Sequence, residues 1–194
     1  RLFKVWAAEL KKFEAPAKSR AAPAVPAPIL DLVALAHKST PVDRSTANGS
    51  SIAMLVEFQG VSLLLGSDMH ASVAVPALKA LAAHRRIPLP MRVDAIKVSH
   101  HASSANVTPA LMQTVPARPY LISTNGAFFG HPDDEAIARL IVNSEDPSTL
   151  LFNFRNAQTS KWDNKALQAK HHFQARYPDS TAGGIGLELS ARSR

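Results

Sequence analysis

The sequence has 194 residues, of which 46% are hydrophobic and 19% charged, and its formal net charge is +7. This is the composition of an ordinary globular domain, and no apolar run approaches the ~18 residues that a membrane-spanning helix needs, so we expect no membrane partner. Because the chain contains no cysteine, disulfide frameworks, thiolate metal sites and cysteine nucleophiles are excluded, and any metal site must use His, Asp or Glu.

The N-terminal segment combines a predicted helix with a proline-rich stretch. Apolar residues at helical spacing predict an amphipathic helix over 2–13, and residues 14–28 contain four prolines, which indicates an extended linker. A short helix is predicted over 29–37. The sequence starts at Arg1, has no Met before Met54 and does not open with a secretory signal. We therefore expect the C-terminal part of a longer protein, and a cytoplasmic one.

From residue 51 onward the pattern is typical of an α/β fold. Apolar strands over 52–58 and 61–65 flank Gln59 and Gly60, which predicts a β-hairpin. Helices and strands then alternate, as in a sheet covered by helices. The further predicted elements are helices at 72–84, 108–115 and 133–143, and strands at 94–99, 120–123, 150–154 and 184–190. The basic segment 155–183 is predicted to dock on the core through Trp162, Leu167, Phe173 and Tyr177.

Three predicted strands are each followed by residues that can bind metal or transfer protons. Asp68 follows the first, the pair His100 and His101 follows the second, and His131 follows the third. Asp and neutral His are suitable ligands for Zn²⁺ or Mn²⁺, and strand-end loops can direct them into one crevice. Taken singly, each has a structural interpretation, such as Asp68 capping the next helix. The other five histidines are expected at the surface: His37, His70, His84, His171 and His172.

Three runs of the sequence resemble one known family. They are NGSSIAMLVEFQGVSLLLGSDM, DAIKVSHHASS and RPYLISTNGAFFGHPDDEAIARLI. Together they look like the C-terminal half of a metallo-β-lactamase-fold hydrolase, closest to the competence-type DNA-uptake hydrolase domains and their stand-alone bacterial relatives. The resemblance covers roughly residues 43–142. It implies half of an αββα sandwich over 43–154, preceded by the segment 1–42 and followed by a basic extension, 155–194, that ends in a strand.

The resemblance also implies roles for particular residues. Asp68 matches the family's metal-bridging aspartate, and His100 or His101 matches its late metal-ligand histidine, the other lining the site. We assign the ligand role to His100, which leaves His101 and His131 as the catalytic candidates. The family's two metal ions would be Zn²⁺ or Mn²⁺. The weaker matches, expected to hold loops or to contact substrate, are Ser103 and Asn125.

The sequence departs from the family pattern in three places. Ser67 stands directly before the aspartate and Ala102 directly after the histidine pair, where the family has glycine. The family's leading His-x-His-x-Asp-His motif is absent, which agrees with a chain that lacks the N-terminal half of the fold. Without that motif the chain supplies only two or three ligands, so the metal sites could be empty in this chain alone.

These observations lead to two main hypotheses. In the first, the intact protein is a metal-dependent hydrolase in which a metal-activated water attacks a phosphoester or another ester-like bond. The basic flanks and the resemblance favour a nucleotide or nucleic acid as substrate, whereas an aromatic content of only 6% argues against one. In the second, the chain is a degenerate, metal-free module that binds a protein partner. A nucleic-acid-binding domain without catalysis is a third hypothesis, based on charge alone.

Overall fold

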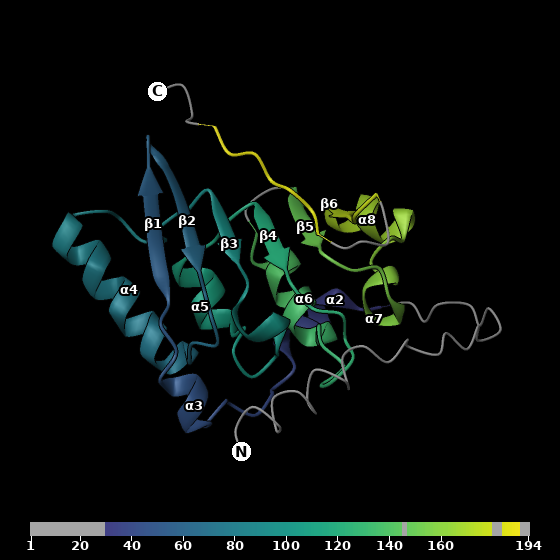
Figure 1. Ribbon diagram of the computed structural model, residues 1–194, viewed down its shortest axis with the longest axis horizontal. Coiled ribbons are helices and arrows are strands. Elements are labelled where there is room, and N and C mark those ends of the chain that lie inside the picture. The colour runs from purple at the N-terminus through teal and green to yellow at the C-terminus, as the bar shows by residue number, and fades with distance from the viewer. Residues whose placement is uncertain (1–29, 145–146, 180–183, 191–194) are drawn as a thin grey trace, which may run out of the picture.

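The computed structural model describes residues 30–144, 147–179 and 184–190 (Figure 1). The helix expected over 2–13 and the proline-rich linker at 14–28 lie outside these ranges. Six strands form one mixed sheet, in which the order in space is the order in sequence. They are β1 (Met54–Phe58), β2 (Val61–Leu65), β3 (Ala95–Lys97), β4 (Pro119–Ile122), β5 (Ser148–Phe152) and β6 (Phe173–Arg176).

The sheet begins with an antiparallel hairpin and continues as a parallel sheet. β1 pairs with β2 in the predicted hairpin, where Phe58 lies opposite Val61. The pairs from β2 to β6 are all parallel. Parallel neighbours need crossover connections, and right-handed crossovers that advance in one direction place their helices on the same face of the sheet. The carboxyl ends of β2 to β5 consequently meet at one edge.

Of the α-helices in the described residues, the first two precede β1 and the others lie in those crossovers. They are α2 (Leu32–His37), α3 (Thr46–Gly49), α4 (Ala71–Arg85), α5 (Pro109–Thr114), α6 (Asp134–Val142), α7 (Ala157–Ser160) and α8 (Lys165–His171). α4 packs against α5, α5 against α6, and α6 against α2, which gives the layer of helices seen beside the sheet in Figure 1. The Thr108 side chain accepts a hydrogen bond from Leu111 N and caps α5, ahead of a proline at the first helical position.

The core lies between this helical layer and the sheet. Its fully buried side chains include Tyr120, Phe152 and Trp162. Trp162 and Phe173 are buried, while Leu167 and Tyr177 pack against the core in part, so the segment after β5 docks as predicted. The strand predicted at 184–190 is wrong, because these residues form no strand and β6 lies earlier. β6 forms the last strand of the sheet with only four residues, of which Phe173 is buried and the next is exposed.

A buried arginine joins the segment after α2 to the loop after β3. Arg139, on α6, is 2% exposed. Its guanidinium donates to the carbonyl oxygens of Ala36 and Lys38 at 3.2 and 2.7 Å, and to those of Ser104 and Val107 at 2.7 and 2.8 Å. Burial lowers its pKa, yet four backbone acceptors compensate the charge. The chain entering the candidate site at residue 43 is anchored by these contacts.

The general α/β class is therefore confirmed. The described residues form one six-stranded mixed sheet with helices. None of the described helices is long and apolar enough to cross a membrane.

Candidate functional site

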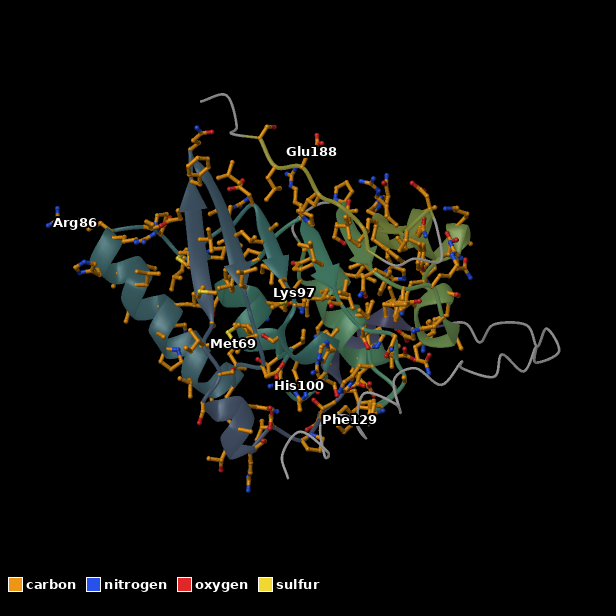
Figure 2. All side chains as sticks on the ribbon, in the orientation of Figure 1. Met69, Arg86, Lys97, His100, Phe129 and Glu188 are labelled. Atoms are coloured by element: carbon orange, nitrogen blue, oxygen red, sulfur yellow. The ribbon has the colours of Figure 1, made fainter. Side chains whose placement is uncertain are left out.

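Five of the six predicted site residues, all but Ser103, line one pocket at the edge where the parallel strands end. Its volume is about 910 Å³. In Figure 2, Met69, His100 and Phe129 mark this end of the molecule, and Glu188 lies at the other. Segments after β2, β3, β4 and β5 contribute to the wall, together with the segment before β1. The lining residues are Asp43, Ser45, Asn48, Asp68, His100, His101, Ser123, Thr124, Asn125, Phe128, Phe129, His131, Asn153 and Phe154.

The turn that carries Asp68 depends on a glycine. A Cβ on Gly66 would lie 2.9 Å from the carbonyl oxygen of Lys97, so only glycine allows this close approach. Ser67 follows with φ +46° and accepts a hydrogen bond of 2.8 Å from His100 N. The loops after β2 and β3 are thus joined directly, and Asp68 enters the same pocket as the histidines.

The histidine pair lies on a strained turn. His100, His101 and Ala102 have φ values of 44°, 55° and 63°, three successive left-handed residues without a glycine. Each such residue costs roughly 1–2 kcal/mol relative to an ordinary conformation. Strain of this kind persists where the surroundings hold it, and it is concentrated at functional sites. The φ of Ala102 is one that a glycine would adopt without strain.

His100 is oriented by a buried amide. Asn106 donates through Nδ2 to Asp43 Oδ2 at 2.9 Å, to Met69 O at 3.1 Å and to Asp68 O at 3.3 Å. Its Oδ1 is thereby turned toward His100 Nδ1, which lies 2.8 Å away. Since an amide oxygen only accepts, Nδ1 of His100 carries the proton, and its Nε2 presents a lone pair when the ring is neutral.

Asp43 is a site residue that the sequence did not reveal. Its side chain is 9% exposed and lies between two imidazoles, 3.4 Å from His100 Nδ1 and 3.5 Å from His70 Nε2. Burial alone would raise the pKa of Asp43, but hydrogen bonds from Asn48, Ser45 N and Asn106 hold it well below its usual range. Asp43 is thus a fixed anion. His70 was expected at the surface and is instead 15% exposed.

His101 and His131 repeat the arrangement of His100. The Nδ1 of His101 lies against the carbonyl oxygen of Ser123, and that of His131 lies 2.9 Å from Asp133 Oδ1. Both acceptors place the proton on Nδ1 and leave Nε2 as the basic nitrogen. Burial would raise the pKa of Asp133, but the bonds from His131 and from Ser104 N lower it to about 2. Three imidazoles therefore share one tautomer.

The three rings are also close to one another. The ring centroid of His100 lies 5.5 Å from that of His131 and 6.3 Å from that of His101, with edge-on geometry in both pairs. Asp68 lines the same pocket, and its charge acts against the lowering of the Lys97 pKa that burial causes. The structure thus brings together Asp68, His100, His101 and His131.

Of the two weaker candidates, one lines the pocket and the other does not. Asn125 lines the pocket, where its Oδ1 accepts from Ala127 N at 3.0 Å. Ser103 is 5% exposed and is not part of the pocket wall; its Oγ accepts from Ala105 N at 3.3 Å. This contact fits the role of holding the loop, rather than that of contacting substrate.

Three phenylalanines at the mouth of the pocket were also missed. Phe128, Phe129 and Phe154 are 55%, 76% and 39% exposed. Each comes directly after a strand or within a strand-end loop, but a periodicity argument assigns an apolar residue to the core by default.

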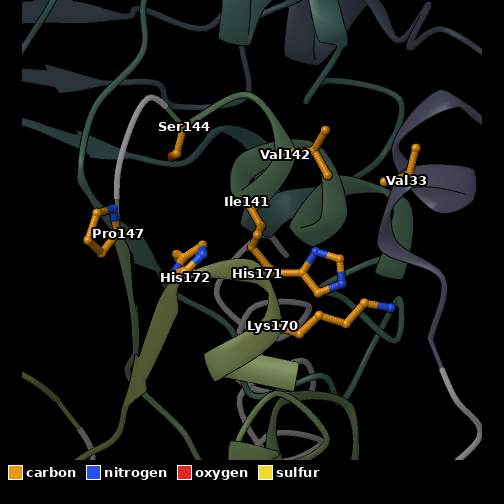
Figure 3. A pocket seen from close by; sticks show the side chains of 8 residues that line it. All are labelled: Val33, Ile141, Val142, Ser144, Pro147, Lys170, His171 and His172. Atoms are coloured by element: carbon orange, nitrogen blue, oxygen red, sulfur yellow. The ribbon is translucent and has the colours of Figure 1, made fainter. Parts of the chain in front are cut away.

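The remaining histidines lie elsewhere. His37, His84 and His172 are exposed, as expected, and His171 is half-buried. His171 and His172 line a second pocket of about 540 Å³ between α6 and α8 (Figure 3). His171 Nε2 is buried there without a hydrogen-bond partner, and burial lowers the pKa of this ring.

The side chains of the strand-end pocket are of the types that bind divalent cations, but too few of them lie close enough together. Imidazoles fixed through Nδ1 by oxygen acceptors are typical of metal ligands. Within residues 30–144, 147–179 and 184–190, however, no three His, Asp or Glu side chains are grouped closely enough to hold an ion. A bound metal would need further ligands from outside these ranges.

Comparison with known proteins gives no independent assignment: no protein-family model, curated protein or solved structure matches this chain.

Proposed function

We propose that the strand-end pocket is the hydrolytic site of a metal-dependent enzyme that cleaves a phosphoester or another ester-like bond in the intact protein. The observation that carries this proposal is the oxygen acceptor beside Nδ1 in each of His100, His101 and His131. Each Nδ1 is held by an oxygen acceptor, so each Nε2 is left as a lone-pair donor at the pocket.

The negative side chains of the pocket favour the binding of a cation. Asp43 and Asp68 line it, and no Lys or Arg is among the described residues of its wall. An anionic substrate alone would meet two carboxylates and be repelled. A divalent cation would be attracted by the same carboxylates and would reverse the local charge. A phosphoester substrate therefore fits this pocket only together with a metal.

When bound, Zn²⁺ or Mn²⁺ would supply a water of lowered pKa and would polarise the ester oxygen. His100 and Asp68 are the residues that would hold it, together with ligands from outside the described ranges. Asn106 fixes the ring of His100, so its Nε2 needs no reorientation on binding.

His131 is the group best placed to move a proton. Its Nδ1–H is held by the Asp133 carboxylate, whose low pKa keeps it ionised at neutral pH. A protonated His131 would be stabilised by that carboxylate and could donate from Nε2 to the leaving oxygen. His101, held by the carbonyl of Ser123, orients the substrate from the neighbouring position.

The test combines metal content with hydrolysis. Zinc and manganese are measured by mass spectrometry in this chain and in the longest natural form of the protein, and hydrolysis of bis(4-nitrophenyl) phosphate is followed in both. We expect about two metal ions per intact site, and a loss of metal and activity in Asp68→Ala and His100→Ala. His84→Ala, at an exposed position on α4, is the matched control. Near wild-type activity in Asp68→Ala would refute the assignment.

A second function is favoured by the missing third ligand. The described residues alone form no group of three metal donors, which agrees with a degenerate, metal-free module that binds a protein partner. If neither form of the protein takes up metal and neither hydrolyses the diester, this second function replaces the first.

A further inference from the structure

Three phenylalanines form an apolar rim beside the histidines. Phe129 is 76% exposed, and Phe128 and Phe154 also line the pocket. We propose that this aromatic rim, defined as Phe128, Phe129 and Phe154, is a binding subsite for a flat aromatic ring on the organic half of the substrate. The inference rests on the proposed hydrolytic function for the position of the ester bond, but the subsite itself has a separate test.

The loop holds the rim in a defined place. Gly126 and Gly130 each have φ +71° and enclose the two adjacent phenylalanines. Asn156 Nδ2 donates to Asn125 O at 2.8 Å, and Gly126 N donates to Thr124 Oγ1 at 3.0 Å. The first bond ties the start of the loop to the N-cap residue of α7, and the second closes a turn within the loop just before the two phenylalanines.

The aromatic rim lies next to His131, the proposed proton donor. The ring centroid of Phe129 is 6.1 Å from that of His131, which in turn lies 5.5 Å from that of His100. Phe128 is 6.1 Å from Phe129 in a tilted arrangement. A ring that stacks on Phe129 would therefore place an attached ester group next to the Nε2 atoms.

The chemistry of the rim favours a flat ring over an aliphatic chain. Exposed apolar groups at the edge of a polar pocket are typical of a ligand site. Aromatic faces also gain from stacked or edge-on partners beyond the burial of area. The volume of about 910 Å³ is near the upper end of small-molecule sites, roughly 300–1,000 Å³, so a ring and an ester group fit together.

Two kinds of substrate carry such a ring, a nucleobase and a simple aryl group. The test therefore uses paired probes with and without a ring. Dissociation constants of benzylphosphonate and methylphosphonate are measured by NMR titration with Zn²⁺ present. Saturation-transfer NMR then follows the uncharged probes benzyl alcohol and adenosine.

We expect benzylphosphonate to bind about 5- to 150-fold more tightly than methylphosphonate, the range typical of one stacked ring. Phe129→Ala and Phe154→Ala should each reduce that preference, and Phe129→Tyr should keep it. Phe129 is exposed enough for the Ala variant to fold. Phe58→Ala removes a phenylalanine that is 72% exposed on β1, outside this pocket, and is the matched control.

The uncharged probes separate the two proposals. If neither phosphonate binds but benzyl alcohol or adenosine still contacts wild type and not Phe129→Ala, the aromatic subsite stands and the hydrolytic function fails. Stronger transfer to adenosine would identify a nucleobase, and stronger transfer to benzyl alcohol a simple aryl group. If no ring-bearing probe distinguishes wild type from both alanine variants, the aromatic subsite is overturned.

Discussion

Two pockets formed by the described residues are lined by histidines, and they differ in what contacts the imidazole nitrogens. In the strand-end pocket, the Nδ1 of each imidazole meets an oxygen acceptor, as His100 meets Asn106. In the pocket between α6 and α8, His171 Nε2 is buried without a partner, and the wall includes Val33 and Ile141 (Figure 3). Two adjacent histidines occur in both places, at 100–101 and at 171–172.

The difference shows that the surroundings of a histidine indicate its role better than the motif does. An anchored Nδ1 fixes the tautomer and the direction of Nε2, which both a metal ligand and a proton donor need. A ring with a buried, unpartnered nitrogen has neither property. Its buried nitrogen disfavours the charged form instead.

The largest expected effect is a loss of Zn²⁺ affinity that is confined to the strand-end pocket. His100→Ala should weaken Zn²⁺ binding by more than about 100-fold, because it removes a ligand whose supports alone are worth about 10–100-fold. His171→Ala should change the affinity by less than about 2-fold. Isothermal titration with Zn²⁺ measures both. Equal losses in the two variants would mean that the pockets do not differ in this respect.

A smaller effect is expected when only the support is removed. Asn106→Ala leaves every proposed ligand in place but frees the ring of His100, so Zn²⁺ affinity should fall by about 10–100-fold. Asn143→Ala, at the end of α6, is the control, because Asn143 hydrogen-bonds to Arg139 O and receives a bond from Gln113. Circular dichroism confirms folding. Unchanged affinity in Asn106→Ala would contradict the role of the support.

The support of His131 predicts a pH dependence of stability. The pKa of Asp133 is lowered from 3.8 to about 2 in the folded chain. Its contribution to stability is therefore complete above the unfolded value and is lost as the pH falls from about 4 to 2. Asp133→Asn should remove about 1–2 kcal/mol at pH 7 and flatten this part of the profile. Urea unfolding between pH 7 and 2 provides the measurement; a parallel profile would exclude the effect.

The smallest effect concerns the second pocket; it also reduces stability as the pH falls, but at a pH closer to neutral. Burial, helped by Lys170, lowers the pKa of His171 below 6.5. Protonation then favours the unfolded chain, so folding loses a little stability as the pH falls below about 6.5. His171→Gln should remove that slope between pH 7 and 5. Thermal unfolding at several pH values in this range checks it, and an unaltered slope would show that another group is responsible.

Much of the fold could be predicted from the sequence because its signals are local. The hairpin at Gln59 and Gly60, the capped start of α5 after Thr108 and the alternation of strands with helices all depend on neighbouring residues. The strand predicted at 184–190 was wrong, since an apolar alternation there is not paired in the sheet, whereas the shorter and more polar β6 is.

The candidate site could be predicted only in part, for a similar reason. Asp68, His100, His101 and His131 follow apolar strands, and parallel strands end at one edge of a sheet. Asp43 follows no strand, and its role depends on Asn106, which is 63 residues away in the chain. Of the Nδ1 anchors, only that of His101 by the carbonyl oxygen of Ser123 joins segments far apart in the chain. The acceptors of His100 and His131 lie six and two residues away, but residue spacing alone does not show which ring nitrogen they contact.

The most direct test of the central claim is the tautomer of each pocket histidine, read from nitrogen-15 chemical shifts and two-bond couplings in the labelled chain. We expect the neutral rings of His100, His101 and His131 to carry the proton on Nδ1, and Zn²⁺ to shift the Nε2 resonance of His100 first. Protons on Nε2 in these rings, or a mixture of the two tautomers, would contradict the account.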